Sequence, residues 1–417
     1  MRRIFLILAA CALVAAPVSA QIALPGVQVP DIGGVLGTTT DLLDRTTHDL
    51  RSTVEKLARD RLRTIDRLVR RHADIIERDS RGAPARRGEL LVMDASPAAL
   101  AASEAAGFEI ISREEIEGLG FTVVRVSVPE GMDLAEAEGA LARLMPGASV
   151  AADNLHFQSS AASGATGGES LVVAASSAAT GVGAPVGMID GAPGAAVPVA
   201  AVRGFAKGAP YPSNHGSAIA SLLAHAGAGP IRVADVYGTD DAGGNALAMA
   251  KGLGWLVGAG SKVVTISLVG PRNPVLERAI GAAQRKGVVV VAAVGNGGPA
   301  APPAYPASYD GVVAVTAVDG RQRALIEAGR ALHLDYAAPG ADIHGIDAEG
   351  DRVRLRGTSF ATPLVAARAA LAIGRGRAWR AALDTQAEDL GREGPDDTYG
   401  RGLICGSCEG VPKKSRD

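Results

Sequence analysis

The chain has 417 residues, 47% of them hydrophobic and only 3% aromatic, and its formal net charge is -2. This length exceeds that of one small domain and suffices for a large core plus a second module. The near-neutral charge provides no basic field for a phosphate backbone, and so few aromatic side chains form no stacking surface for bases. Nucleic acid is therefore not an expected partner.

The N-terminus has the pattern of an export signal. Two arginines precede an apolar run at 4–16, and residues 18–20 are the small-x-small ending that signal peptidase reads. We expect cleavage after Ala20 (signal peptide 1–20) and a protein that is periplasmic or extracellular. The apolar run is too short for a membrane anchor, which needs roughly 20 apolar residues. A lipoprotein signal at Cys11 is the alternative, and no later segment predicts a stable membrane span.

Three segments follow the signal. Residues 21–87 are an extension whose apolar side chains recur at three- and four-residue steps from Thr39 to Arg78, which predicts a long amphipathic helix. Residues 88–157 indicate the order strand, helix, strand, strand, helix, strand, typical of a small ferredoxin-like α+β module. Residues 158–181 are rich in Ala, Ser, Gly and Thr and predict a flexible linker. A small module joined by a soft linker to a larger one suggests a segment that is removed by cleavage.

Residues 182–404 alternate buried-strand runs with helical stretches. This pattern predicts an α/β domain with a mostly parallel sheet and helices on both faces. In open sheets of this kind, the functional site lies beyond the carboxyl ends of the strands. The tail at 405–417 holds Cys405 and Cys408, for which export favours a local disulfide; a thioredoxin-type redox motif belongs at a strand-to-helix junction instead.

Four polar residues stand at the ends of predicted strands or the starts of predicted helices. Asp190 ends a strand, and His215 precedes a helix whose N-terminal dipole disfavours a charged imidazole. Asn296 lies between glycines after a strand, as a turn residue or an oxyanion donor. Ser359 precedes a long helix, as a helix cap or a nucleophile. Each has an ordinary structural explanation alone, but Asp, His and Ser in this chain order are typical of the subtilisin-type triad.

These residues and their neighbours resemble the subtilase family across residues 182–404. The segment Gly357–Pro363 matches the family signature Gly-Thr-Ser-x-Ala-x-Pro. The residues around His215, Asp190 and Asn296 resemble its histidine, aspartate and oxyanion motifs. The resemblance implies a subtilisin-like serine endopeptidase that hydrolyses peptide bonds through an acyl-enzyme.

The resemblance also implies a role for each matched residue. Ser359 would attack the scissile carbonyl, and His215 would take its proton and pass it to the leaving amine. Asp190 would hold the imidazole in the correct tautomer, and Asn296 would donate to the oxyanion together with the Ser359 backbone N–H.

The module at 88–157 resembles the subtilase propeptide, an intramolecular chaperone and inhibitor. Its tail, Asn154–Phe157, would occupy the active site until the zymogen cleaves itself between about Phe157 and Gly181. The resemblance does not account for the helix predicted upstream of this module.

Subtilases bind a polypeptide substrate as an added strand. Val269 stands where the family usually has glycine, and Ala304 stands where a glycine often floors the pocket for the P1 residue, the substrate residue before the scissile bond. Both changes add bulk, so we expect a shallow pocket for small or medium apolar residues. The expected substrate-binding residues are Gly243, Gly244, Ser267, Leu268, Val269, Gly270, Ala293, Gly295 and Ala304.

No cofactor and no metal is expected. The loop at 226–230 is shorter than the family's calcium loop and has no carboxylate, so a calcium site is not carried over. The main alternative function is a catalytically inactive subtilase fold that acts as a binding module; loss of a triad residue would be its expected signature. An α/β-hydrolase would need a Gly-x-Ser-x-Gly elbow and a histidine after the serine, and the sequence has neither arrangement.

Overall fold

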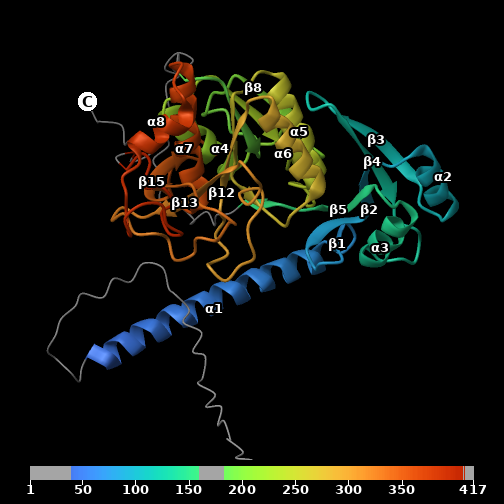
Figure 1. Ribbon diagram of the computed structural model, residues 1–417, viewed down its shortest axis with the longest axis horizontal. Coiled ribbons are helices and arrows are strands. Elements are labelled where there is room, and N and C mark those ends of the chain that lie inside the picture. Colours follow the sequence, from blue (N-terminus) through green and yellow to red (C-terminus); the bar gives the residue numbers. More distant parts are fainter. Residues whose placement is uncertain (1–38, 159–182, 407, 409–417) are drawn as a thin grey trace, which may run out of the picture.

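A computed structural model describes residues 39–158, 183–406 and 408, with the backbone alone for 39–50 (Figure 1). The predicted export signal, nearly all of the linker and most of the C-terminal tail lie outside these ranges. None of the helices within them combines the length and hydrophobicity that a membrane crossing requires.

The large domain is built on a seven-stranded sheet in the order β14-β13-β12-β10-β7-β9-β8. Every neighbouring pair in this sheet is parallel, which confirms the predicted parallel sheet. The short strands β8 and β14 were not predicted. The strands are β7 (Val186–Asp190), β8 (Ala201–Gly204), β9 (Ile231–Asp235), β10 (Val263–Ile266), β12 (Val289–Ala293), β13 (Val313–Val318) and β14 (Tyr336–Pro339).

Helices cover both faces of this sheet, as predicted (Figure 1). Strand β7 alternates between two apolar cores: Met188 packs in the core with α4 and α7, and Ile189 packs in the core with α5 and α6. A hairpin of β15 (Ala341–Ile346) and β16 (Arg352–Arg356) precedes α7. The helices are α4 (Asn214–His225), α5 (Ala246–Gly258), α6 (Pro274–Arg285), α7 (Thr358–Gly374) and α8 (Trp379–Gln386).

The small module has the predicted order of strands and helices. Its antiparallel sheet runs β5-β2-β4-β3, a ferredoxin-like arrangement, with β1 added beside the start of β2. Helices α2 and α3 cover one face, and the other face packs against α5 and α6 of the large domain. The elements are β1 (Ile76–Arg78), β2 (Pro84–Met93), α2 (Pro97–Ala105), β3 (Ile110–Ile116), β4 (Phe121–Ser127), α3 (Leu134–Leu144) and β5 (Ser149–Asn154).

The long N-terminal helix is shorter than predicted. Helix α1 spans Thr39–Arg71, and residues 76–78 form strand β1 instead of a last helical turn. Antiparallel pairing with β2 satisfies the backbone N–H and C=O groups of β1. Ile76 therefore continues the apolar spacing of the helix but lies in a strand.

The end of β5 fastens the module to the N-termini of two large-domain helices. The Asp153 Oδ1 atom accepts a hydrogen bond from the Leu247 N–H at the start of α5, at 3.0 Å. The Asn273 amide at the start of α6 donates to the Ala152 carbonyl, at 2.9 Å. Helix N-termini leave backbone N–H groups without helical partners, and the Asp153 contact satisfies one of them in α5. The Ala152 contact instead orients Asn273, whose Oδ1 atom caps α6. Both contacts hold only while the module is docked.

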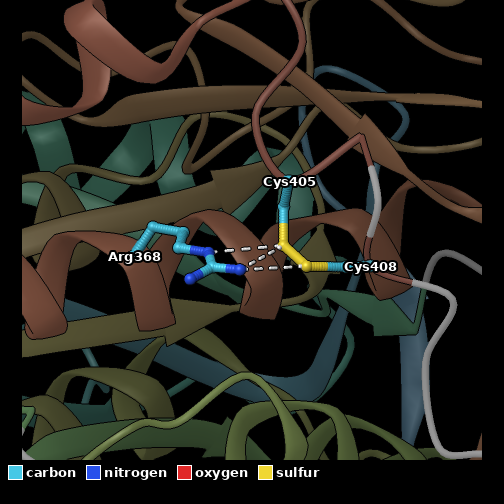
Figure 2. Close-up of a disulfide and its surroundings, with 3 residues drawn as sticks. All are labelled: Arg368, Cys405 and Cys408. Carbon is cyan, nitrogen blue, oxygen red and sulfur yellow. Dashed lines mark hydrogen bonds between the residues drawn. A yellow bond between two sulfur atoms is a disulfide. The ribbon is translucent and has the colours of Figure 1, made fainter.

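Cys405 and Cys408 are bonded in the structure, and the Arg368 guanidinium of α7 donates to both sulfurs at 3.2 Å (Figure 2). A disulfide stabilises mainly by restraining the unfolded chain, and a four-residue loop restrains it little. We expect Cys405→Ser to lower the free energy of unfolding by no more than about 2 kcal/mol. Urea denaturation measures the loss; a loss of more than about 4 kcal/mol would show that the contacts with Arg368 dominate.

Candidate active site

The predicted catalytic residues come from three elements that meet at the carboxyl edge of the sheet. Asp190 is the last residue of β7. His215 lies in the first turn of α4, which begins one residue earlier, because the Ser213 hydroxyl caps the helix by accepting from the Gly216 N–H at 3.1 Å. Ser359 lies in the first turn of α7 behind Gly357, so it is not the helix cap that its sequence position also allowed.

The Asp190 carboxylate holds the imidazole of His215. The Nδ1 atom of His215 lies 2.9 Å from both carboxylate oxygens. The aspartate side chain is fully buried and that of the histidine is 7% exposed. The Oδ1 atom also accepts from the Gly191 N–H at 2.8 Å, which fixes the carboxylate plane. A carboxylate accepts only, so Nδ1 carries the proton and Nε2 is left as the base.

Ser359 is buried against the residues that follow β10. Its hydroxyl donates to the Ser267 carbonyl at 3.2 Å, and the Ser267 hydroxyl donates to the Ser359 carbonyl at 2.8 Å. The next residue in the helix, Phe360, packs its ring 5.5 Å from the imidazole of His215. The Nε2 atom of His215 has no hydrogen-bond partner among the described residues. Catalytic hydrogen bonds are often long before substrate binds, so this geometry is compatible with transfer of the Ser359 proton.

Asn296 lies beside the start of α7. Its Oδ1 atom accepts from the Thr358 N–H at 3.0 Å. An amide whose oxygen is engaged in this way has its NH₂ group left as the donor. The structure thus brings Asn296 to the residue next to Ser359, with its donor group available for an anion.

The end of the small module lies beside the candidate site as an added strand. Strand β6 (Phe157–Gln158) pairs antiparallel with β11 (Leu268–Val269), with Phe157 opposite Val269. On the other side, the His156 N–H donates to the Gly244 carbonyl at 2.9 Å. The tail therefore lies between two edges, as an extended substrate would.

The sequence did not predict a role for Gln158, because the predicted tail ended at Phe157. Its side-chain amide donates to the Asp190 Oδ1 atom at 3.1 Å. The contact could not be predicted from the sequence around Gln158, because it depends on the register of β6 against β11. The role of Phe360 was also missed, although it lies inside the signature segment.

The other predicted substrate-binding residues differ in how close they lie to this strand. Gly270 lies under the imidazole ring of His156, where a Cβ atom would sit 2.6 Å from ring Cδ2, so only glycine fits. Gly270 also exchanges hydrogen bonds with Tyr305, which places buried Ala304 next to that edge. Gly243 packs against Tyr237 instead of the tail. Ala293 and Gly295 lie at the end of β12 and just beyond it.

Two buried titratable groups lie in the last strand of the module and its tail. Burial lowers the pKa of His156 to about 4. Burial, followed by repulsion from Glu89, raises the pKa of Asp153 to about 7. Each is therefore held in its neutral form near neutral or mildly acidic pH while the module is docked.

Within the described ranges, no three His, Cys, Asp or Glu side chains come together in a group that could hold a metal ion.

Comparisons with known proteins agree with this architecture. Residues 205–402 match the sequence model of the subtilase family. Thermitase from Thermoactinomyces vulgaris is 35% identical over 186 residues, 44% of this chain and 65% of thermitase. Subtilisin DY from Bacillus licheniformis is 34% identical over 166 residues, 38% of this chain and 60% of that protein. The chain thus spans under two thirds of the length of these two relatives.

A solved structure that aligns with a larger share of this chain has the same fold. Fervidolysin from Fervidobacterium pennivorans, described as a keratinolytic enzyme related to subtilisin, superposes with a TM-score of 0.61 over 78% of this chain and 61% of that one, at 18% identity. The family match includes His215, Asn296 and Ser359 and begins after Asp190, which only the geometry brings to the site. Residues 205–402 thus match the subtilase family in sequence, and the large domain that contains them has the subtilisin-like fold.

Proposed function

We propose that the protein is a serine endopeptidase made as a self-processing zymogen, with Asp190, His215 and Ser359 as its triad. The observation that carries this proposal is the buried Asp190–His215 pair at the sheet edge, beside a serine in the first turn of a helix. A substrate strand that paired with β11 as the tail does would continue past Ser267, whose carbonyl accepts from the Ser359 hydroxyl.

The chemistry follows from the positions of the groups. The Ser359 hydroxyl attacks the carbonyl carbon while His215 Nε2 takes its proton, and Asp190 stabilises the imidazolium. The Asn296 amide and the Ser359 backbone N–H, at the start of α7, stabilise the oxyanion. Collapse passes the proton from His215 to the leaving amine and leaves an acyl-enzyme, which water hydrolyses by the same steps in reverse.

A serine-directed fluorophosphonate tests the proposal without knowledge of the natural substrate. We expect the self-processed protein to react once per chain, and peptide mapping to find the adduct on Ser359. Labelling that is absent from folded, processed protein, or present on another serine, would reject the proposal.

The zymogen part rests on the docked tail, the capped helices and the sequence of the N-terminus. Residues 88–157 would act as intramolecular chaperone and inhibitor, self-cleavage would fall in the linker, and the signal at 1–20 would export the chain to the periplasm or beyond. Expression with the intact N-terminus and N-terminal sequencing of the exported product tests both cleavages.

Removing the proposed oxyanion donor gives a smaller defect than removing a triad residue. We expect Asn296→Ala to lower kcat about 10²–10³-fold with little change in KM, because the amide contacts the substrate oxygen mainly in the transition state. Steady-state kinetics on a peptide substrate measure this. A KM effect with unchanged kcat would instead assign Asn296 to ground-state binding.

Docking of the tail should weaken in acid through His156. Its pKa falls from 6.5 when free to about 4 when docked, so its contribution is fully present above pH 6.5 and is lost as the pH falls toward 4. Between pH 7.5 and 4.5, docking of the wild-type tail should weaken about 100-fold relative to His156→Gln, whose side chain stays neutral.

Comparison of the two chains at each pH cancels the opposite contribution of Asp153, which is lost as the pH rises toward 7. Hydrogen exchange of residues 155–158, measured in Ser359→Ala to prevent cleavage, reports the docking. Parallel pH profiles for the two chains would show that His156 is not the titrating group.

The alternative function is a catalytically inactive binding module with this fold. It would share the docked tail but would give neither a serine adduct nor self-cleavage. The intact Asp190–His215 hydrogen bond favours the protease, since a binding module has no need of an oriented imidazole.

A further inference from the structure

The Val269 side chain reaches from β11 toward the segment that follows β12. It lies on the β11 edge, and its Cγ1 and Cγ2 atoms are 3.2 and 3.4 Å from the position that a Cβ would occupy on Gly295. Gly295 lies beyond the end of β12, next to Asn296. The valine side chain therefore fills the gap between the two backbone segments that follow β10 and β12.

The strand order says which substrate residue meets this side chain. The end of β10 lies between the ends of β7 and β12. Gln158 pairs with Leu268 and points its side chain toward Asp190, at the end of β7. A substrate in this register places its next residue opposite Ser267, which is hydrogen-bonded to Ser359. Since side chains alternate along a strand, that next side chain points toward Gly295 and meets Val269.

We propose that Val269 determines specificity by closing the P1 pocket, so that the enzyme cleaves after glycine, alanine or serine. This inference rests on the proposed protease function. The chain's own sequence agrees independently. The residue after Gln158 is Ser159, and it is followed by Ser160-Ala161-Ala162. Self-cleavage after Ser159 is the expected processing event.

The test compares peptide substrates that differ only in P1, alanine or phenylalanine, across three chains. Wild type should prefer alanine at least tenfold in kcat/KM, and Val269→Gly should raise kcat/KM for phenylalanine at least tenfold. Val202→Gly, a matched change on the edge strand β8, should keep the wild-type preference. A wild-type preference for phenylalanine, or no change in Val269→Gly, overturns the proposal while leaving the protease function intact. If the folded protein hydrolyses neither peptide and also fails to react with the fluorophosphonate, the protease function itself is rejected.

Helix α1 supplies a separate observation at the same cleft. Among its described side chains, the half-buried ones include Val54, Leu57, Arg61, Ile65 and Leu68, all on one face at helical spacing, whereas Leu62 is 56% exposed. The helix runs along the lower side of the large domain in Figure 1.

This face contacts both the loop after Asn296 and the docked tail. The Leu57 Cδ1 atom lies 3.2 Å from the position of a Cβ on Gly298, two residues after Asn296. At the other end, Leu68 packs in one apolar cluster with Leu155 and Phe157 of the tail. Just beyond the helix, His72 lies 3.2 Å from Asp241, near the Gly244 edge.

From these contacts we infer that α1 is an inhibitory strap. It covers the docked tail and the loop after Asn296 together, so the tail leaves the cleft readily only when α1 leaves as well. The apolar spacing of α1 is then explained by intramolecular docking onto the zymogen.

Hydrogen exchange in the uncleavable Ser359→Ala chain tests the strap independently of protease activity. Leu57→Glu/Leu68→Glu should raise the exchange rate of tail residues 155–158 at least tenfold, and Leu62→Glu, on the exposed face, should leave it unchanged. If the double glutamate chain loses its cooperative melting transition, Leu57→Ala/Leu68→Ala decides in its place. The strap proposal is overturned if the exchange rate of residues 155–158 is unchanged in the folded variant. It is also overturned if Leu62→Glu raises that rate as much as the double substitution does.

Discussion

A chain with Ser359→Ala is expected to remain at full length after removal of the signal and to hydrolyse peptides at least about 10⁴-fold more slowly than wild type. The hydroxyl is the only group of the proposed triad that forms the covalent intermediate. The substitution removes one buried oxygen and its hydrogen bond to the Ser267 carbonyl, and it leaves the start of α7 intact. Activity should therefore fall far more than stability.

Intact mass spectrometry of both chains measures processing, and peptide hydrolysis measures turnover. Ser221→Ala is a matched control, since Ser221 is also a buried helical serine and its hydroxyl accepts from the Ile346 N–H at 3.0 Å, away from the site. The control should still process itself. Self-processing that persists in Ser359→Ala would exclude this serine as the nucleophile.

The parts of the fold that follow from local pattern were predictable from the sequence. Long valine-rich runs become the central strands of the large sheet, and the order of elements in the small module follows from alternating periodicities. The candidate site residues were proposed from their order along the chain and from the signature around Ser359. They lie together because a parallel sheet brings the ends of distant strands to one edge.

The parts that depend on tertiary partners were not predictable. Strand β1 continues the apolar spacing of a helix and becomes a strand only because β2 offers it an edge. The contact of Gln158 with Asp190 depends on the register of β6 against β11, two segments that lie far apart in the sequence. The apolar stripe of α1 was visible, but the surface that it covers forms only when the tail and the loop after Asn296 come together in the fold.

Asp190→Asn should lower kcat by about 10⁴-fold while leaving KM and the fold nearly unchanged. The aspartate accepts from His215 Nδ1 at 2.9 Å and so leaves Nε2 unprotonated. An asparagine can donate to Nδ1 instead, which stabilises the tautomer with its proton on Nε2 and removes the base that Ser359 needs. The test matters here because Asp190 lies outside the segment that matches the family, so its role rests on geometry.

Asp235 provides the matched control, because it is the buried aspartate at the end of the adjacent strand β9, directly opposite Asp190 in the sheet register. It accepts from the backbone N–H groups of Tyr211 and Tyr237 at 2.7 and 2.9 Å, and no hydrogen bond between it and His215 occurs among the described contacts. Asp235→Asn should therefore lower stability and leave kcat within about tenfold of wild type. If the two substitutions lower kcat equally, the loss reflects the packing of the sheet edge, and orientation of His215 by Asp190 would be rejected.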